Sequence, residues 1–355
     1  MYKILVINPG STSTKSALFD DESSVFNINI SHSPPELAKF PEIIDQFTWR
    51  CEVIKSMLNE RGITLNSIDA VVGRGGLLNA IPGGTYSVNE KMMSDLRRGV
   101  QGEHASNLGG LMAYEFASSL EIPAFIVDPV VVDELDEVAR ISGIPDIKRR
   151  SIFHALNQKQ VARLAARELK KSYDEINLIV VHMGGGISVG VHKKGKVVDV
   201  NNALNGEGPF TPERSGSLPV WDLVKLVLSG KYTRDELKKK ITGKGGLVAY
   251  LGTNDLREVR EKMNRGNEKA KLLYEAMAYQ ISKEIGACAT VLRGDIQGIV
   301  LSGGLAHDNA FIELIRRSVN FIAKIFVFPG GDEMKALAMG ALRVLRGEER
   351  AKVYK

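Results

Sequence analysis

Short apolar runs alternate along the chain with longer stretches in which apolar residues recur every three to four positions. Short apolar runs bounded by turn residues are typical of buried strands, and the wider spacing is typical of helices. We therefore expect an α/β fold in which the two kinds of element alternate. Strands are predicted at residues 3–8, 16–20, 70–74, 124–128, 178–182, 188–193, 298–302 and 325–328.

Four helices have the clearest periodicity. The first repeats apolar residues between Ile44 and Leu58, and Gly62 follows where a helix commonly stops. The other three are predicted over residues 151–171, 267–293 and 333–346.

Two segments about half a chain apart follow one pattern. Residues 3–20 and residues 178–196 each combine a strand, a turn of small residues and a second strand. Such repetition predicts a duplicated domain whose halves face each other across a cleft, although two unrelated hairpins would look the same. With a hinge at the basic stretch 147–150, one domain is expected over 1–147 plus 334–355 and the other over 148–333.

Length and composition agree with two globular domains, because 355 residues exceed one ordinary core. The net charge of +5 is modest, and the basic residues are interspersed with acidic ones, so we expect no nucleic-acid partner. No signal-peptide pattern and no long uncharged apolar run occurs, which predicts no membrane partner. The only cysteines, Cys51 and Cys288, form no CxxC pair, which favours a reducing, cytoplasmic compartment.

The turn after the first predicted strand has the chemistry of a phosphate cradle. Backbone amides, the hydroxyls of Ser11 and Ser13 and the ammonium of Lys15 can all donate to an anion. The spacing is not that of a Walker A loop, and an ordinary turn remains the alternative.

Glycines follow two later strands, and glycine lets a ligand approach the backbone closely. The first group follows His182 and predicts a second phosphate contact, whereas the second predicts a contact with a nucleoside. These glycines are Gly184, Gly185 and Gly186, and then Gly303 and Gly304.

The whole chain resembles the acetokinase family. The resemblance rests on four motifs that occur in the family's order: the opening turn from Asn8 to Lys15, the Phe153-His154 pair, the glycine turn after His182 and the Gly-Gly-Asp-Glu-Met motif. That family belongs to the superfamily of acetate and sugar kinases, heat-shock chaperones and actin, and the butyrate kinases within it are the most similar. The resemblance implies two RNase H-like domains of the actin-like ATPase kind. It also implies a reversible in-line transfer, butanoate + ATP = butanoyl phosphate + ADP, with Mg²⁺ as cofactor.

The resemblance further assigns roles to residues of this sequence. The catalytic residues implied are Arg74, Arg214, His154 and Asp128. The ATP contacts implied are Asn8, Ser11, Ser13, Lys15, His182, Gly184, Gly185 and Gly186, with Asp255 and Arg257 near the adenosine. Glu333 and Asp128 would hold Mg²⁺, partly through water, and His104 would join Arg74 in the carboxylate pocket.

General chemistry supports the two arginines. Transfer of a phosphoryl group to a carboxylate brings two anions together, and a well-placed arginine is worth about 10³–10⁵ in rate. A planar guanidinium matches both groups in a way that lysine does not. Arg74 and Arg214 fall in different predicted halves, and a surface or ion-paired role remains the alternative for each.

The histidines differ in what their context indicates. His154 stands near a predicted helix start, where backbone amides favour anions, but a capping or core role is equally open. His307 follows the nucleoside loop and is placed near the base. No role is assigned to His32 or His192.

The acyl chain is predicted from small residues. Gly75 and Gly76 follow Arg74 and leave room for a substrate longer than acetate, and residues 208–212 are a further candidate wall. Two methylenes are worth only about fifteenfold in affinity, so acetate, propionate and branched-chain acids remain alternative substrates.

Other functions remain open. They are a sugar kinase, a non-catalytic actin-like nucleotide-binding protein and a regulator, the last disfavoured because no DNA-binding helix pair precedes the first strand. The small carboxylate and the nucleotide are the expected partners, together with further copies of the chain.

Overall fold

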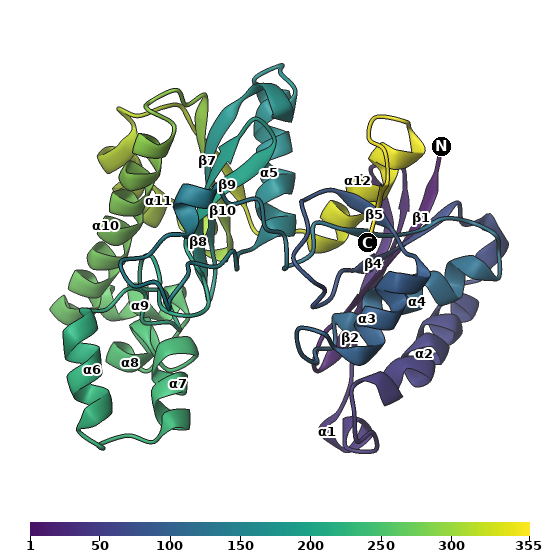
Figure 1. Cartoon of the computed structure of the whole chain (residues 1–355), viewed down its shortest axis with the longest axis horizontal. Coiled ribbons are helices and arrows are strands. Elements are labelled where there is room, and N and C mark those ends of the chain that lie inside the picture. Colours follow the sequence, from purple (N-terminus) through teal and green to yellow (C-terminus); the bar gives the residue numbers. More distant parts are fainter. The chain divides into compact units, whose positions relative to one another are not determined.

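The computed structural model describes residues 1–355, and the chain divides into two compact units. Unit 1 contains residues 1–133 and 332–355, and unit 2 contains residues 134–331 (Figure 1). Each unit consists of one sheet covered by helices.

The sheet of unit 1 has seven strands in the order β12-β5-β6-β4-β1-β2-β3. The β1–β2 and β2–β3 pairs are antiparallel, whereas β4 and β6 run parallel to β1. The strands are β1 (Lys3–Pro9), β2 (Ser13–Asp20), β3 (Ser23–Ser31), β4 (Ala70–Arg74), β5 (Thr85–Ser87), β6 (Ala124–Val127) and β12 (Lys352–Val353).

Helices cover both faces of this sheet. Leu5, Ile7 and Val71 point to a core shared with α2, α3 and α4. Alternate residues face the other way, where Val127 meets Gly340 of α12 so closely that a Cβ at position 340 would clash. The helices are α1 (Pro34–Leu37), α2 (Phe47–Glu60), α3 (Glu90–Arg98), α4 (Asn107–Ser118) and α12 (Glu333–Leu345), with short 3₁₀ turns η1 (Ile44–Gln46) and η2 (Leu65–Ser67).

The sheet of unit 2 has five strands in the order β11-β10-β7-β8-β9. Its central strand β7 pairs antiparallel with β8 and parallel with β10, as β1 does with β2 and β4. The predicted duplication is therefore confirmed by strand order and direction. The strands are β7 (Asn177–Met183), β8 (Ile187–Lys193), β9 (Lys196–Val200), β10 (Gly298–Gly303) and β11 (Ile325–Pro329).

Alternation along β7 again divides the side chains between two cores. Ile179 and Val181 pack toward α10 and α11, and Leu178 and Val180 pack toward α5. Figure 1 shows these helices beside the strands of unit 2. The helices are α5 (Ala155–Glu168), α6 (Val220–Leu228), α7 (Arg234–Thr242), α8 (Gly246–Leu251), α9 (Leu256–Asn264), α10 (Glu268–Val291) and α11 (Asn309–Val319), and the 3₁₀ turns are η3 (Glu137–Arg140), η4 (Tyr173–Glu175) and η5 (Gly304–His307).

All eight predicted strands and all four predicted helices are present. The chain enters unit 2 at Glu134, before the hinge predicted at 147–150. The reason is that Glu134 pairs with Lys159 of α5 at 2.8 Å, and Arg149 pairs with Asp199 of β9 at 2.9 Å. No helix has the length and apolar character needed to cross a membrane.

Candidate active site

The carboxyl ends of three parallel strands bring together polar residues of unit 1. Ile7 of β1 is level with Gly73 of β4, and Arg74 is level with Val127 of β6. Asn8, Arg74 and Asp128 therefore stand at the same edge of the sheet, although they are far apart in sequence. This edge is where ligands commonly bind to sheets with parallel strands.

Glu333 joins this edge from the first turn of α12. Its Oε1 lies 2.5 Å from Nη1 of Arg74, and its Oε2 accepts a hydrogen bond of 2.9 Å from Nδ2 of Asn8. Burial alone raises the pKa of the Glu333 carboxyl, but Arg74, Asn8 and Lys15 together outweigh burial and lower it. Glu333 is therefore an anion at neutral pH, held by two residues that the sequence had assigned to other roles.

Asp128 is buried and has a positive φ of 37°, which is unusual for a residue other than glycine. Its Oδ1 accepts a hydrogen bond of 2.7 Å from the amide of Gly84, and its own amide donates to the Gly84 carbonyl at 3.0 Å. The strained backbone thus fixes this carboxylate at the strand end.

The turn between β1 and β2 is anchored from below by Arg50. This side chain is fully buried in α2 and donates from Nη1 to the carbonyl of Ser13 at 3.0 Å and to Oγ1 of Thr14 at 2.9 Å. Burial lowers its pKa to about 10, so Arg50 stays charged at neutral pH. The sequence missed Arg50 because it occupies a core position of an otherwise apolar helical pattern. Ser11 on the turn and Lys15 near the start of β2 are both exposed.

His104 lies near Arg74. The pKa of His104 is lowered by burial and by the charge of Arg74, so its ring is neutral at pH 7.

Gly75 and Gly76 are closely packed. A Cβ at Gly75 would lie 2.5 Å from Pro129, and one at Gly76 would lie 2.5 Å from Asn107. Close packing therefore explains both glycines, and they give no evidence for a wide acyl pocket.

The glycine turn between β7 and β8 lies against Arg214 in unit 2. A Cβ at Gly186 would stand 2.0 Å from Nη1 of Arg214, so the guanidinium rests directly on the turn. Thr211 connects the two segments, because its Oγ1 donates to the Gly185 carbonyl at 2.5 Å and accepts from the Arg214 amide at 2.9 Å. The predicted phosphate turn and the predicted catalytic arginine are thus neighbours.

Arg214 has unused donor capacity. Its Nη1 donates to the Ala203 carbonyl, while its buried Nε has no hydrogen-bond partner. Burial lowers its pKa, and Glu213 opposes this effect. A half-buried guanidinium with an unpaired N–H beside a glycine turn is suited to bind an anion.

His154 and His182 are stacked, with ring centroids 4.0 Å apart. His182 Nδ1 lies 2.7 Å from Oδ1 of Asn157, an atom that can only accept. His154 Nδ1 lies 2.9 Å from the hydroxyl of Ser188. The two predicted histidines therefore form one group at the carboxyl edge of the unit 2 sheet.

A chain of buried hydrogen bonds leads from Ser188 beside His154 to Tyr173. Nε2 of Gln158 donates to the Ser188 carbonyl at 3.0 Å and to its hydroxyl at 2.8 Å, and this hydroxyl still has a proton to donate. Oε1 of Gln158 accepts from Nε2 of His192 at 2.9 Å, and Tyr173 lies 2.7 Å from Nδ1 of His192. When the Ser188 hydroxyl donates to Nδ1 of His154, the neutral ring carries its proton on Nε2. His192, to which the sequence assigned no role, is part of this chain.

Burial makes His192 a source of pH-dependent stability. Its pKa is lowered well below 6.5 by burial and by the charges of Lys159 and Arg163, so the folded ring stays neutral. The unfolded ring takes up a proton below about pH 6.5. The free energy of unfolding should therefore decrease as the pH is lowered below this value, by up to about 1.4 kcal/mol per pH unit. Urea unfolding between pH 7.5 and 5 measures this. The free energy of unfolding of His192→Asn should depend less steeply on pH than that of the native protein. Equal slopes would mean that the buried His192 ring is not the source of the pH dependence.

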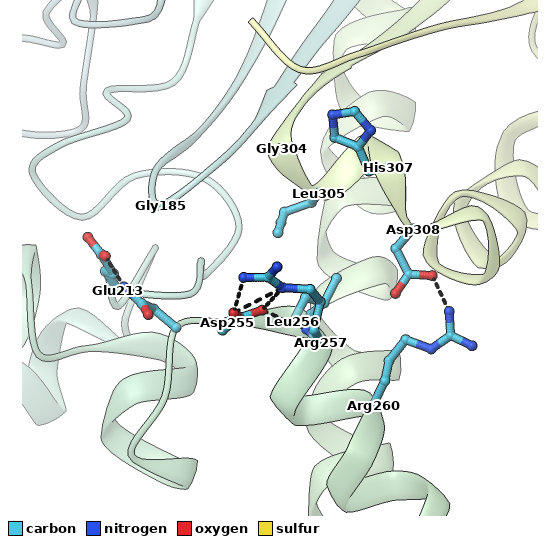
Figure 2. Close-up of a pocket in the computed structure, with 11 residues that line it drawn as sticks. Gly185, Glu213, Asp255, Leu256, Arg257, Arg260, Gly304, Leu305, His307 and Asp308 are labelled. Atoms are coloured by element: carbon cyan, nitrogen blue, oxygen red, sulfur yellow. Dashed lines mark hydrogen bonds and ion pairs between the residues drawn. The ribbon is translucent and has the colours of Figure 1, made fainter. Parts of the chain in front are cut away.

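A pocket of about 660 Å³ lies in unit 2, and Gly185 of the glycine turn is one of its lining residues. Arg257 reaches into its centre, where Nη2 contacts Oδ2 of Asp255 at 2.6 Å (Figure 2). Asp255 caps α9, and its pKa is lowered chiefly by Arg257. The lining residues are Gly185, Glu213, Asn254, Asp255, Leu256, Arg257, Arg260, Gly304, Leu305, His307 and Asp308.

Four residues predicted to contact ATP line this pocket, namely Gly185, Asp255, Arg257 and Gly304, and His307 lines it as well. Gly303 does not line it. This glycine has a φ of 89°, and a Cβ there would lie 2.3 Å from the Met183 carbonyl, so it is required by the contact between β10 and β7.

The sequence missed several pocket residues. Asp308 caps α11 and receives hydrogen bonds from Arg260 at 2.9 Å and Tyr274 at 3.0 Å, while Glu213 receives one from Asn254 at 2.5 Å. Asp308 follows His307 directly, and the N-cap preference of aspartate was the available indication.

Unit 1 offers two carboxylates as candidate ligands for Mg²⁺ but no complete set of protein ligands. No group of three or more histidine, cysteine, aspartate or glutamate side chains is placed to hold a metal. Glu333 and Asp128 nevertheless present hard oxygens at one sheet edge. Such a set suits an ion held largely by water and substrate phosphates rather than by a protein cage.

Comparison with known proteins identifies relatives of this chain. The chain is 57% identical, over the full length of both proteins, to butyrate kinase 1 of Clostridium acetobutylicum. A model of the acetokinase family matches residues 145–329.

Two solved structures have the same fold. An acetate kinase of Porphyromonas gingivalis superimposes with a TM-score of 0.79 at 21% identity, covering 97% of this chain and 100% of the other. A propionate kinase of Francisella tularensis gives a TM-score of 0.72 at 19% identity, covering 96% and 99%. The fold is therefore that of actin-like kinases, and with the full-length identity above, this chain belongs to the acetokinase family.

Proposed function

We propose that the protein transfers the γ-phosphoryl group of ATP to the carboxylate of a short-chain fatty acid, with butyrate preferred. The full-length identity of 57% to a butyrate kinase carries this proposal. Each unit would supply part of the chemistry that the reaction needs. Unit 1 is the candidate carboxylate and phosphate domain, and unit 2 is the candidate nucleotide domain.

In unit 1 the carboxylate would bind to the guanidinium of Arg74. The contact with Glu333 holds that guanidinium in place. Its remaining N–H groups can donate hydrogen bonds to the substrate carboxylate. His104 is neutral and so can donate a hydrogen bond without adding charge. The exposed hydroxyl of Ser11 and the ammonium of Lys15 would contact phosphate from the β1–β2 turn.

In unit 2 the adenosine would occupy the 660 Å³ pocket, and the phosphates would lie along the glycine turn. Arg214 and Nε2–H of His154 would donate to the phosphoryl group in transfer. A carboxylate oxygen attacks phosphorus, the bond to the bridging oxygen breaks, and ADP leaves. No proton is removed from the acceptor, so no general base is needed.

Bound Mg²⁺ would neutralise phosphate charge, and Glu333 and Asp128 are the residues that would hold it, partly through water. The reaction is reversible because an acyl phosphate is itself a strong phosphoryl donor. We expect the protein to act in the cytoplasm.

A panel of acceptors tests this function and its rivals. Hydroxamate trapping of the acyl phosphate should give the highest kcat/KM with butyrate, and lower values with acetate, propionate and branched acids. The expected advantage of butyrate over acetate is about fifteenfold. Phosphorylation of a sugar without any hydroxamate product would favour a sugar kinase. Nucleotide binding with no transfer to any acceptor would favour an actin-like binding protein.

The contact between the glycine turn and Arg214 yields a separate prediction. Gly186→Ala should lower kcat by about 10-fold to 100-fold while the protein remains folded, because the added methyl displaces only the end of a flexible side chain. Gly143→Ala is the matched control, since nothing lies within 4 Å of a Cβ there. Kinetics and thermal melts of both variants check this. Unchanged kcat in folded Gly186→Ala would show that the position of Arg214 is unimportant.

A further inference from the structure

Arg50 is a buried cation without a counter-ion. It lies in α2 with no exposed surface, and the four hydrogen bonds that it donates all go to neutral oxygens. Two of them go to Oε1 of Gln46, from Nε at 3.0 Å and from Nη2 at 2.8 Å, and the others reach the Ser13 carbonyl and the Thr14 hydroxyl. No carboxylate shifts its pKa, which burial alone lowers to about 10. A guanidinium kept from water without an anion beside it is costly, so this one requires an explanation.

Two other deeply buried charges of the chain have a partner of opposite sign. Lys159 is 2% exposed and pairs with Glu134 at 2.8 Å. Asp95 is fully buried and contacts the ammonium of Lys91. Because the chain supplies no such anion to Arg50, a bound ligand is the remaining source of negative charge.

The turn between β1 and β2 lies directly on Arg50 and carries donors with no partner. Ser11 and Thr12 are exposed, and neither their amides nor their hydroxyls make a hydrogen bond within the chain. The Ser13 carbonyl that accepts from Arg50 also accepts from the Gly10 amide at 2.8 Å, which closes the turn. The free donors therefore stand one and two residues from the contact with the guanidinium.

His32, which follows β3, supports the turn from its other side. Its amide donates to the Thr12 carbonyl at 2.8 Å, and its Nε2 lies 2.8 Å from the Thr14 hydroxyl. Burial and the charge of Arg50 lower the pKa of His32, so the ring is neutral at pH 7 and adds no charge of its own. Arg50 therefore provides the buried charge at this turn.

We propose that Arg50 is a positioning residue for the phosphoryl group in transfer, whose charge it balances through the β1–β2 turn. This inference rests on the proposed function, which supplies the anion. A phosphate oxygen bound by the amides of Ser11 and Thr12 would lie on the order of 10 Å from the guanidinium, by ordinary backbone dimensions. Lys15 is exposed and water screens its charge, whereas a buried charge is screened little at this distance. Arg50 thus attracts the anion and also holds the turn that binds it.

Gln46→Glu separates the charge of Arg50 from its hydrogen bonds. Oε1 of Gln46 accepts two of these bonds, and the amide nitrogen of Gln46 donates to no group of the chain. The introduced carboxylate therefore keeps every bond and neutralises the cation. If Arg50 were a clamp that needs only its donors, phosphate binding would not change. If its charge is required, the Kd for inorganic phosphate should rise about tenfold or more.

Calorimetric titration with inorganic phosphate measures this Kd, and thermal melts confirm the fold. Asn59→Asp is the matched control, because it makes the same change of charge at the exposed end of α2 and should keep the native Kd. The unfolding temperature of Gln46→Glu should not fall, because Arg50 gains the counter-ion that it lacks. A native Kd for Gln46→Glu, a lower unfolding temperature of this variant, or no phosphate binding by the native protein would overturn the proposal.

Titration with ADP identifies which phosphate occupies the turn. ADP lacks the group that is transferred, so its Kd should be the same for Gln46→Glu and for the native protein. A loss as large as that for inorganic phosphate would place another nucleotide phosphate on the turn and overturn the assignment. These titrations need no fatty acid and no turnover. Failure of the proposal therefore leaves the transfer reaction standing, and hydroxamate formation tests that reaction separately.

Discussion

Replacing Arg214 by lysine should lower kcat by about 10³-fold, with little change in the KM for ATP. The guanidinium rests on the glycine turn, where the phosphates are proposed to lie, and its buried Nε has no hydrogen-bond partner. Lysine keeps the charge but loses the planar donors that match the phosphoryl oxygens in transfer. An interaction made mainly in the transition state affects kcat more than binding.

Steady-state rates of acyl hydroxamate formation measure this effect. Arg265→Lys is the matched control, because Arg265 is 81% exposed and only pairs with Glu261 at 3.9 Å. Both variants should unfold at the native temperature. A kcat for Arg214→Lys within threefold of the native value would remove Arg214 from the mechanism.

Replacing Arg74 by methionine should lower kcat/KM for the carboxylate by about 10²–10³-fold, mostly through a higher KM for the acid. Methionine retains much of the side-chain volume but removes the cation that both holds Glu333 and would bind the substrate. It also leaves Glu333 half-buried with only Asn8 as a close partner. The KM for ATP should change less than the KM for the acid.

A double-mutant cycle with Glu333→Gln separates the two roles of Arg74. Since Arg74 and Glu333 are in contact, the loss in the double variant should be clearly smaller than the sum of the two single losses. Additive losses would mean that the ion pair has no part in activity. The pH dependence of stability gives a second check. The pKa of Glu333 is lowered in the folded protein, so its contribution is present above the unfolded pKa near 4.3 and is lost as pH falls through the lower folded pKa.

Much of the fold could be predicted from local pattern. β1, β4, β7 and β10 are continuous apolar runs because both faces of each are covered by helices. The strand β3 was missed although Phe26, Ile28 and Ile30 alternate with polar residues. It lies at the edge of its sheet and is only partly buried, which gives a weak apolar signal.

The candidate site could be predicted residue by residue but not contact by contact. The sequence proposed Asn8, Arg74 and Glu333 for three separate tasks, and only the parallel register of β1 and β4 with the position of α12 shows them bonded together. Gly75 and Gly76 show a different difficulty. Small side chains predict room for an acyl chain, but Pro129 and Asn107 lie where a Cβ would stand, so close packing also accounts for these glycines.

Buried polar residues were the hardest to interpret from sequence. Arg50 and His192 have no neighbours in sequence that point to a function, and their roles depend on contacts 19 to 37 residues away, with Ser13 and Tyr173. Such networks arise from tertiary packing, so spacing along the chain does not reveal them.

The transfer of phosphate to a carboxylate is tested most directly by following ATP and butyrate together. Phosphorus NMR of the native protein with ATP, Mg²⁺ and butyrate should show an acyl phosphate signal that grows in step with ADP. With butyrate kept below its KM, both signals should grow at least about a hundredfold more slowly with the Arg74→Met and Arg214→Lys variants. ADP formation at the same rate with and without butyrate, and no acyl phosphate, would contradict the account.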